Sequence, residues 1–364
     1  MRYRAPYRLM TAFVRPGGKI NSAEGIFASD GKARKAAARL FGKNRVIGAA
    51  LGLFDVKGPV GIVTWGSAGH GRDVVPNTFF RVASVSKMVT AALAAGMILD
   101  GRLDADRDAA DYLGVPLRAD KWPDVPVTPA MLMSHTASVN DTDVLFHPEL
   151  SLDDAVRRLS FTGEKPGEAF RYSNEGAALL GAVLEKASGQ DLDALYAAEF
   201  GTSGTFFPSR LPPDAHMSDG IRLLPTRKTL LSGAAEDRGD PPALSAAGHW
   251  NRAHGGLCLR AEDAAKIGVR LMTDGRYAAL RREVIPMGER DPGITEGMGM
   301  FVIRYAECGG KTVYGHQGLA YGASHGIFFA PETGKGAVIL TSGCSLARDH
   351  VLTDLNRDVI RAYL

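Results

Sequence analysis

The chain has 364 residues and a net charge of +3, from 43 lysines and arginines against 40 aspartates and glutamates. That length is enough for one large two-lobed unit or two ordinary domains, with a sizeable buried core. The near balance of charge, without a dense basic stripe interleaved with aromatic residues, argues against nucleic acid as a partner. No stretch reaches the roughly 18 uninterrupted apolar residues of a membrane-spanning helix, so we expect no transmembrane segment. Composition leaves the oligomeric state open.

The N-terminal region, residues 1–22, is basic and contains glycine, with weak hydrophobic periodicity, which predicts an arm or loop. Its apolar residues 9–14 are too few for a secretory signal sequence, and residues 15–18 do not resemble a small-residue cleavage site. We therefore expect a cytoplasmic protein, or a periplasmic one if a leader has been removed.

Helix and strand patterns alternate in the next part of the chain. Residues 22–41 are rich in alanine, with basic residues among them, and predict a surface helix that ends at Gly42. Two β-type runs at residues 46–54 and 60–65 predict a hairpin. Residues 88–99 carry no charge, which predicts a helix surrounded by protein on nearly every side.

The middle of the chain is predicted to be mainly helical, with long surface loops at residues 208–249. Capping residues and glycine stops predict helices at residues 130–135, 175–187 and 261–273. Strand patterns return near the C-terminus, followed by an amphipathic helix. The predicted strands are residues 299–305, 312–316, 326–330 and 336–341, and the helix is residues 347–364.

Both chain ends therefore supply strands, and the middle supplies helices. The economical architecture is an α+β fold, an α/β sandwich in which one antiparallel sheet from both chain ends has flanking helices and an inserted, mainly helical lobe. We predict an arm at residues 1–22 and one domain at residues 23–364. Its α/β lobe would comprise residues 23–80 and 295–364, and its helical lobe about residues 81–294.

Ser84 and Lys87 lie three residues apart at the start of the uncharged helix, so both side chains occupy one helical face. A buried lysine needs specific partners or must lose its charge, because isolated burial of an ammonium group is costly. On this motif alone, the simpler interpretation is that Ser84 caps the helix and Lys87 extends to water. The alternative is a nucleophile beside a cation.

Three further stretches are candidates for the groups that a serine nucleophile needs, namely a proton acceptor and donors for an oxyanion. Tyr172 and Asn174 straddle one residue in a turn that opens a helix, so both can face one cleft. His316 and Gly318 lie on a late strand-like run, and the sequence Met-Ser-His-Thr-Ala occupies residues 133–137.

In this order, Ser84-x-x-Lys87, Tyr172-x-Asn174 and His316-x-Gly318 resemble the three motifs of the penicillin-recognising serine hydrolases. The tyrosine motif and residues 133–137 resemble the branch that holds class C β-lactamases, lactamase-like esterases, D-amino-acid peptidases and amidases, and D-alanyl carboxypeptidases. The resemblance covers about residues 48–342 and implies a β-lactamase/transpeptidase-like fold.

The resemblance also implies a role for each motif. Ser84 would attack a substrate carbonyl and form an acyl-enzyme. The base would be either Tyr172, ionised with help from the Lys87 cation, or a neutral Lys87 with Tyr172 relaying the proton; both stay open. Asn174 would position Lys87 and the substrate amide. By resemblance, the oxyanion would lie between the backbone N–H groups of Ser84 and Leu319.

His316 departs from the penicillin-binding pattern, in which a lysine of a Lys-Thr-Gly motif occupies this place. An unperturbed histidine is mostly neutral at pH 7, so the site lacks a cation for a substrate carboxylate. We therefore expect a serine hydrolase for small neutral esters, amides or peptides, including D-amino-acid derivatives. The alternatives are a D-alanyl-D-alanine carboxypeptidase or weak β-lactamase, and a penicillin-binding-like protein with little turnover.

Three other patterns are interpreted as structural. Ser324 lies in a G-x-S-x-G sequence, the nucleophile elbow of α/β-hydrolases, but a strand-like run and not a helix follows it. His135 is expected to satisfy a helix C-terminus or the adjacent loop. His249 and His254 have no carboxylate at helical spacing, and none of the 3 cysteines has a metal-ligand spacing partner, so we expect no metal and no cofactor.

Overall fold

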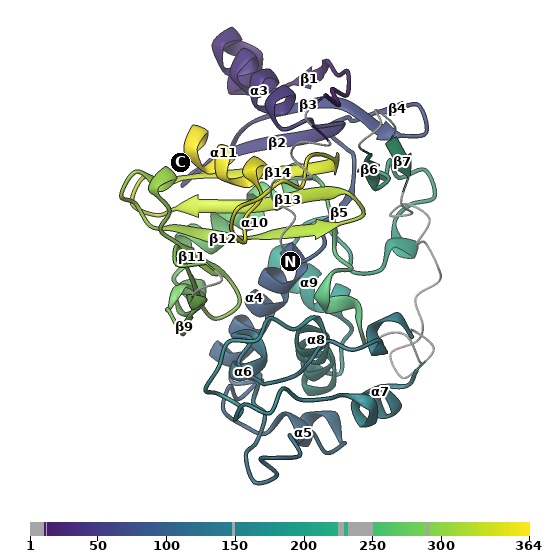
Figure 1. Cartoon of the computed structure of the whole chain (residues 1–364), viewed down its shortest axis with the longest axis vertical. Helices are drawn as coiled ribbons and strands as arrows, with labels where there is room; N and C mark the ends of the chain where they lie inside the picture. Colours follow the sequence, from purple (N-terminus) through teal and green to yellow (C-terminus); the bar gives the residue numbers. More distant parts are fainter. Residues whose placement is uncertain (1–10, 12, 148–149, 225–228, 232–249, 289–290) are drawn as a thin grey trace.

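A ten-stranded antiparallel sheet, to which both ends of the chain contribute, is the largest element of the fold. The computed structural model describes residues 11, 13–147, 150–224, 229–231, 250–288 and 291–364 (Figure 1). The strand order is β1-β3-β2-β14-β13-β12-β11-β10-β9, with β4 paired to β3. These strands are β1 (Ile20–Ala23), β2 (Gly48–Asp55), β3 (Gly58–Gly69), β4 (Arg72–Asp73), β9 (Ile285–Pro286), β10 (Ile294–Glu296), β11 (Phe301–Ile303), β12 (Val313–Ala320), β13 (Ala323–Ala330) and β14 (Lys335–Gly343).

The N-terminal and C-terminal strands pair in one sheet, as predicted. The expected hairpin forms β2 and β3, with Leu51 opposite Val63. On its other side β2 pairs with β14, where Ile339 lies opposite Leu51. This contact closes the sheet between N-terminal and C-terminal strands, so the predicted fold class, an α+β sandwich with one antiparallel sheet, is confirmed.

Helices cover both faces of the central strands (Figure 1). Along β14, Ala337 and Ile339 pack in the cluster that includes α3 and α11, whereas Val338 and Leu340 join the larger core around α4 and α10. Because successive side chains of a strand point to opposite faces, burial of both faces produces a continuous apolar run. The helices are α2 (Ile26–Ser29), α3 (Gly31–Lys43), α4 (Val85–Leu99), α5 (Ala109–Leu113), α6 (Pro129–Met133), α7 (Leu152–Arg158), α8 (Asn174–Ser188), α9 (Leu192–Phe200), α10 (Ala261–Thr273) and α11 (Asp354–Tyr363).

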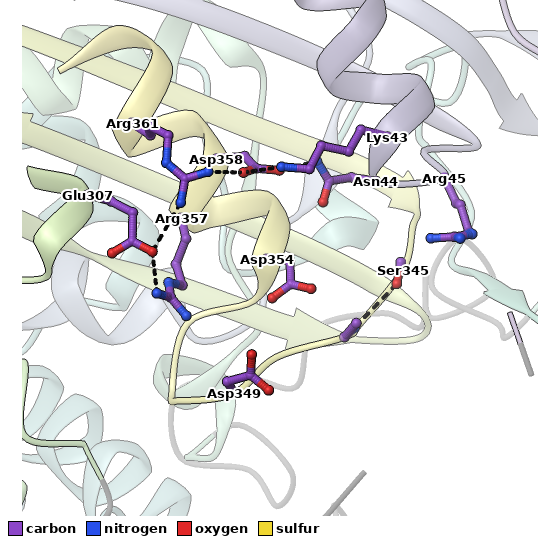
Figure 2. Close-up of a pocket in the computed structure, with 11 residues that line it drawn as sticks. Lys43, Asn44, Arg45, Glu307, Ser345, Asp349, Asp354, Arg357, Asp358 and Arg361 are labelled. Carbon is purple, nitrogen blue, oxygen red and sulfur yellow. Dashed lines mark hydrogen bonds and ion pairs between the residues drawn. The ribbon is translucent and has the colours of Figure 1, made fainter. Parts of the chain in front are cut away.

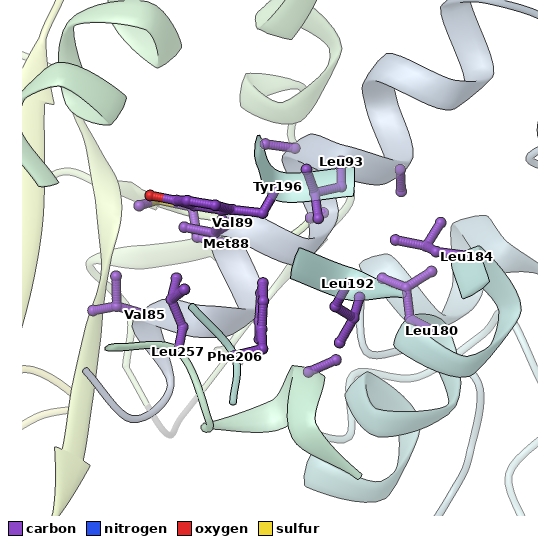
Figure 3. Close-up of a cluster of buried hydrophobic side chains, with 14 of the residues drawn as sticks. Val85, Met88, Val89, Leu93, Leu180, Leu184, Leu192, Tyr196, Phe206 and Leu257 are labelled. Atoms are coloured by element: carbon purple, nitrogen blue, oxygen red, sulfur yellow. The ribbon is translucent and has the colours of Figure 1, made fainter. Parts of the chain in front are cut away.

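Helix α4, which contains the uncharged residues 88–99, lies inside the protein, as its sequence predicts. Its first 13 residues are all buried. Figure 3 shows Val85, Met88, Val89 and Leu93 of α4 surrounded by side chains of α8, α9 and the segments near Phe206. On its other side α4 contacts β12 and β13. Although residues 88–99 of α4 carry no charge, no described helix is long and apolar enough to cross a membrane.

The structure differs from the predictions near both chain ends. Residues 20–23, placed partly in the arm, form strand β1, and the predicted helix at residues 22–41 is replaced by β1, α2 and α3. The break has a local cause, because the Asp30 side chain accepts a hydrogen bond from the backbone N–H of Lys32 and so begins a new helix. The C-terminal helix begins only at Asp354, capped by the Thr353 side chain.

The predicted lobes do not coincide with the layers of the structure. Strand β9 belongs to the sheet, and α10 packs against β2 and β14, although both lie in the range predicted for the helical lobe; β10 lies across the predicted boundary. The division into an arm and a two-lobed domain therefore stays a prediction. The loops predicted at residues 208–249 contain a short hairpin of β6 (Ile221–Leu223) and β7 (Thr229–Leu231). Much of that range, including His249, lies outside the described residues.

Candidate active site

Ser84 lies at the N-terminus of α4, half-buried, and its side chain makes no capping hydrogen bond. Its hydroxyl oxygen instead accepts a hydrogen bond from Lys87 Nζ at 3.1 Å. The preceding residue, Ala83, has a φ of +48°, which is uncommon for a residue with a side chain. The helix entry is therefore strained, and the simple interpretation of Ser84 as a helix cap is wrong.

Lys87 is buried, with 4% of its surface exposed, so the interpretation that it extends to water is also wrong. Besides the Ser84 hydroxyl, Nζ donates to Asn174 Oδ1 at 2.7 Å and to the carbonyl oxygen of His254 at 2.6 Å. Burial lowers the pKa of Lys87 to about 7, although the Asp141 carboxylate works in the opposite direction. Roughly half of the amine is then neutral at pH 7.

The partners of Lys87 determine where a neutral amine would point its lone pair. A carbonyl oxygen can only accept a hydrogen bond, so the oxygens of Asn174 and His254 take the two N–H groups of a neutral amine. The lone pair is then directed at the Ser84 hydroxyl, which can donate its proton. This arrangement is the one that a general base needs.

Tyr172 lies beside this pair, with its ring centroid 5.1 Å from Lys87 Nζ. Burial raises the pKa of Tyr172 above its ordinary value, and a hydrogen bond with Ser84 lowers it only in part. The Asp141 carboxylate raises the pKa further. Tyr172 is therefore protonated near neutral pH, and of the two alternatives for the base the electrostatics favours a neutral Lys87.

Asn174 is the first residue of α8, a helix that Ser173 caps by accepting from the backbone N–H of Gly176. Its amide oxygen faces Lys87, and its amide nitrogen donates to Asp141 Oδ2 at 2.6 Å. Sequence reasoning missed both Asp141 and the carbonyl of His254. Asp141 belongs to no motif, and every residue has a carbonyl, so no local pattern identified either contact.

His316 and Gly318 bring strand β12 against Ser84. A Cβ atom at Gly318 would lie 2.0 Å from the carbonyl oxygen of Val82 and 3.1 Å from the backbone nitrogen of Ser84. Only glycine therefore allows this close approach. Leu319, the next residue, is half-buried. The assignment of an oxyanion to the N–H groups of Ser84 and Leu319 stays a prediction.

The imidazole of His316 is fully enclosed and uncharged. It stacks on Phe301 at a centroid distance of 4.2 Å, and its Nδ1 lies 2.6 Å from the carbonyl oxygen of Gln317. Burial and the nearby Lys87 lower the pKa of His316 to about 3. The histidine is therefore neutral, as the sequence leads us to expect. Its Nε2 is buried and has no hydrogen-bond partner among the described residues.

Glu296 of β10 is a second buried polar group behind the site that the sequence did not single out. It is 0% exposed, and neither carboxyl oxygen has a hydrogen-bond partner among the residues that the structure describes. Burial raises the pKa of Glu296 well above its ordinary value. The carboxyl is therefore protonated at neutral pH.

His135 and Ser324, which the sequence led us to interpret as structural, both make hydrogen bonds that support the fold. His135 Nδ1 accepts from the backbone N–H of Ser173 at 3.2 Å, so the histidine supports the start of α8 and not the end of its own helix. Its ring lies 4.5 Å from that of Tyr172. Ser324 is buried within β13 and bonds to Thr353 at 2.8 Å, so it lies in a strand and not in a nucleophile elbow.

Comparison with known proteins gives similarities over most of the chain. The family model described as Beta-lactamase matches residues 25–361. The chain is 26% identical over 342 residues to penicillin-binding protein 4 of Amycolatopsis lactamdurans, covering 87% of this chain and 86% of that protein. It is 27% identical over 332 residues to esterase EstB of Burkholderia gladioli, covering 80% and 84%.

A probable fimbrial assembly protein, FimD of Dichelobacter nodosus, is 35% identical over 128 residues, but the match spans only 33% of this chain and 32% of that protein. Among solved structures, EstCE1, a hydrolase with promiscuous acyltransferase activity, superposes with a TM-score of 0.74 at 20% identity. That superposition covers 91% of this chain and 98% of the other. At this identity the likeness shows a shared fold.

Proposed function

The chain belongs to the Beta-lactamase family, and on this premise we propose that it is a serine hydrolase that cleaves esters or amides through an acyl-Ser84 intermediate. The observation that carries the proposal is the buried amine of Lys87, 3.1 Å from the Ser84 hydroxyl, with its other two contacts made to oxygens that only accept hydrogen bonds. A neutral amine in this setting takes the proton of Ser84.

The reaction would proceed in two halves. Ser84 Oγ attacks the substrate carbonyl carbon while its proton passes to Lys87, and the backbone N–H groups of Ser84 and Leu319 stabilise the oxyanion. Collapse of the intermediate expels the alcohol or amine, which receives the proton from Lys87 through the hydroxyl of Tyr172. Water then attacks the acyl carbonyl and gives its proton to Lys87 by the same route. Lys87 returns this proton to Ser84 Oγ as the bond to the acyl group breaks, which releases the acid and free Ser84.

The state of His316 supports neutral substrates. A neutral imidazole offers no charge to a carboxylate, whereas a lysine in its place would. A D-alanyl carboxypeptidase or a β-lactamase acts on substrates with a free carboxylate, so this site supports those activities less well. The similarity to a protein named as an esterase supports the same choice.

A substrate panel tests the proposal. It contains p-nitrophenyl acetate and butyrate, a D-alanine p-nitroanilide and a chromogenic cephalosporin. We expect one of the uncharged substrates to have the largest kcat/KM, and S84A to lower that value by at least about 1,000-fold. If S84A hydrolyses the best substrate as fast as the wild type, the assignment is wrong.

Mass spectrometry of the intact protein separates an enzyme from a scaffold that is acylated but does not turn over. With a slow acyl donor, an enzyme shows an adduct on Ser84 that disappears with time, whereas a scaffold keeps it. The variant H316K tests the charge argument. It should react faster with the cephalosporin, and the absence of any gain for carboxylate-bearing ligands would contradict the argument.

A further inference from the structure

Asp141 is an exposed carboxylate on the loop that follows α6, outside every motif, and its two oxygens accept four hydrogen bonds from residues at the start of α8. We propose that Asp141 is a positioning residue, which fixes the amide of Asn174 with its oxygen toward Lys87 and acts on Lys87 by its charge. Its expected effect on turnover rests on the proposed hydrolase function. Its effect on Lys87 itself does not.

The contacts of Asp141 divide between its two oxygens. Oδ1 accepts from the backbone N–H groups of Asn174 at 2.6 Å and Glu175 at 3.1 Å, and from the Ser173 hydroxyl at 3.1 Å. These contacts cap α8. Among the residues that the structure describes, Oδ2 has one partner, the amide nitrogen of Asn174, at 2.6 Å. Oδ2 therefore contacts the Asn174 side chain and takes no part in the helix cap.

This separate contact decides the orientation of the Asn174 amide. A carboxylate accepts hydrogen bonds and cannot donate them, so it requires the NH2 end of the amide. The oxygen end must then face the opposite side, where Lys87 Nζ lies 2.7 Å away. A reversed amide would place two acceptors together at Asp141 and two donors together at Lys87. Asp141 thus acts through Asn174, because it orients the amide oxygen that accepts the hydrogen bond from Lys87.

The loop holds Asp141 in place from both sides. The backbone N–H of Asn140 donates to the carbonyl of Ser160 at 2.9 Å. On the other side, the backbone N–H and the hydroxyl of Thr142 donate to one carboxyl oxygen of Glu175, at 2.8 and 2.6 Å. The backbone on both sides of Asp141 is therefore held by hydrogen bonds that do not involve Asn174.

Asp141 also provides the opposite charge that acts on Lys87, since its carboxylate raises the pKa of Lys87 while burial lowers it. The other titratable groups around Lys87 are uncharged near pH 7 because burial disfavours their ionised forms. They are His135 of the loop after α6, His254 of the segment Arg252–His254, His316 of β12, Tyr172 before α8, and Glu296 of β10. The cations Arg81 and Arg252 act on the neighbouring His254.

The variant D141N tests both effects together. It keeps the size of the side chain and one oxygen for the helix cap, but it presents an NH2 group to the NH2 group of Asn174. We expect kcat to fall by about 10- to 100-fold, the effect of losing one hydrogen bond to a charged group. The rising limb of kcat/KM against pH should move to lower pH, because Lys87 loses the negative charge that favours its protonated form.

The double variant D141N/N174D exchanges the two groups. It restores a donor facing an acceptor and keeps the total charge, but it places the carboxylate directly against Lys87. The rising limb should now move to higher pH than in the wild type. A purely structural role for Asp141 predicts no shift in D141N, whereas the upward shift in the double variant shows that the assay detects a negative charge beside Lys87. The exchange also keeps a cap on α8 if D141N alone folds poorly.

The matched control is D143N, two residues away on the same loop. Asp143 has a side chain that is 83% exposed and lies 3.7 Å from His147. The charge change is the same as in D141N, but no contact with Asn174 is lost. We expect the pH profile and kcat of D143N to equal those of the wild type. Equal shifts in D141N and D143N would overturn the proposal.

NMR of the full-length chain with 13C-labelled lysine measures the Lys87 titration without any substrate, with K87R to assign the signal. A Lys87 titration that moves down in D141N and up in D141N/N174D supports the proposal even if no ester or amide is hydrolysed, in which case only the proposed function fails. An unchanged titration in D141N, in an enzyme whose activity depends on Ser84, overturns the role of Asp141 and leaves the function standing.

Discussion

Two regions on opposite faces of the sheet differ in the partners of their ionisable side chains: charged groups in one, mainly neutral groups in the other. On the α3 and α11 face, a pocket of about 560 Å3 is lined by basic and acidic side chains that pair with one another. Figure 2 shows Asp358 between Lys43 and Arg361, and Glu307 in contact with Arg357 and Arg361. Five of the charged side chains that line this pocket therefore meet an opposite charge: Lys43, Glu307, Arg357, Asp358 and Arg361.

On the α4 face, Lys87 meets neutral acceptors and an uncharged phenol, and the carboxylate that acts on it lies behind Asn174. Burial therefore shifts the pKa of Lys87 to about 7, a value suited to proton transfer near neutral pH. The same residue type is a structural ion-pair partner in one region and a candidate base in the other. The surroundings decide which role a lysine has.

The largest expected difference between the two faces is in activity. Replacement of the buried amine in K87M should lower kcat/KM by at least about 1,000-fold, because the candidate base is gone. Its melting temperature should not fall, because an apolar side chain replaces a buried amine. The matched variant K43M removes a half-exposed ion pair with Asp358 and should change activity by less than about 3-fold and stability by less than about 1 kcal/mol. Kinetics and thermal unfolding of both variants check this contrast.

The effect of adding a methyl group to a glycine should differ almost as strongly between the two faces. In G318A the new methyl group meets the Val82 carbonyl at 2.0 Å, so β12 must move away from Ser84. We expect a loss of about 100-fold in kcat/KM and of about 1–3 kcal/mol in stability. In G42A of α3 the methyl group meets no atom within 4 Å, and the variant should gain about 0.5–1 kcal/mol without kinetic change. A fully active G318A would contradict the close contact.

Glu307 and Glu296 show the same contrast in protonation state, with smaller expected effects. Burial raises the pKa of Glu307, but its own backbone bond and the adjacent Arg357 and Arg361 bring it below the ordinary value, whereas Glu296 is buried and protonated. E307Q should cost about 1–3 kcal/mol through lost charged hydrogen bonds. E296Q, which resembles a protonated carboxyl, should leave stability and activity at pH 7 nearly unchanged. Chemical denaturation measures the free energy of unfolding of both variants. If E296Q lost as much stability as E307Q, Glu296 would be ionised in the folded protein.

The smallest expected effect is the dependence of stability on pH. The pKa of Lys87 is lower in the folded than in the unfolded chain, so between about pH 7 and 10 the unfolded chain binds more protons and stability rises with pH. The wild type should therefore gain up to about 1 kcal/mol per pH unit relative to K87M between pH 7 and 9. K43M should show no such difference from the wild type. Parallel curves for K87M and the wild type would mean that Lys87 titrates normally.

Motifs that act over one helical turn or one strand could be found in the sequence because local geometry alone determines their spacing. Ser84 and Lys87 lie on one helical face whatever surrounds them, and Tyr172 and Asn174 share one turn. The uncharged run of α4 likewise predicted a buried helix without knowledge of its neighbours. The early and late strand patterns predicted one sheet, and β14 does pair with β2.

Contacts between distant segments could not be found in this way. The capping oxygen of Asp30 split a predicted helix, and β9, β10 and α10 crossed a predicted lobe boundary, because pairing and packing override local pattern. Asp141 lies 33 residues from Asn174, and the carbonyl of His254 lies 167 residues from Lys87. No residue spacing encodes either distance.

The sequence by itself determined which groups are present: a serine, a lysine, a tyrosine, an asparagine, and a histidine where relatives of the penicillin-binding type carry a second lysine. Only the tertiary structure decided the protonation states of Lys87 and Tyr172. Burial of Lys87 among neutral oxygens and of Tyr172 between His135 and Lys87 favours a neutral amine over a phenolate. The physical reason is that a pKa depends on solvent exposure and on charges from the whole fold, which no local motif specifies.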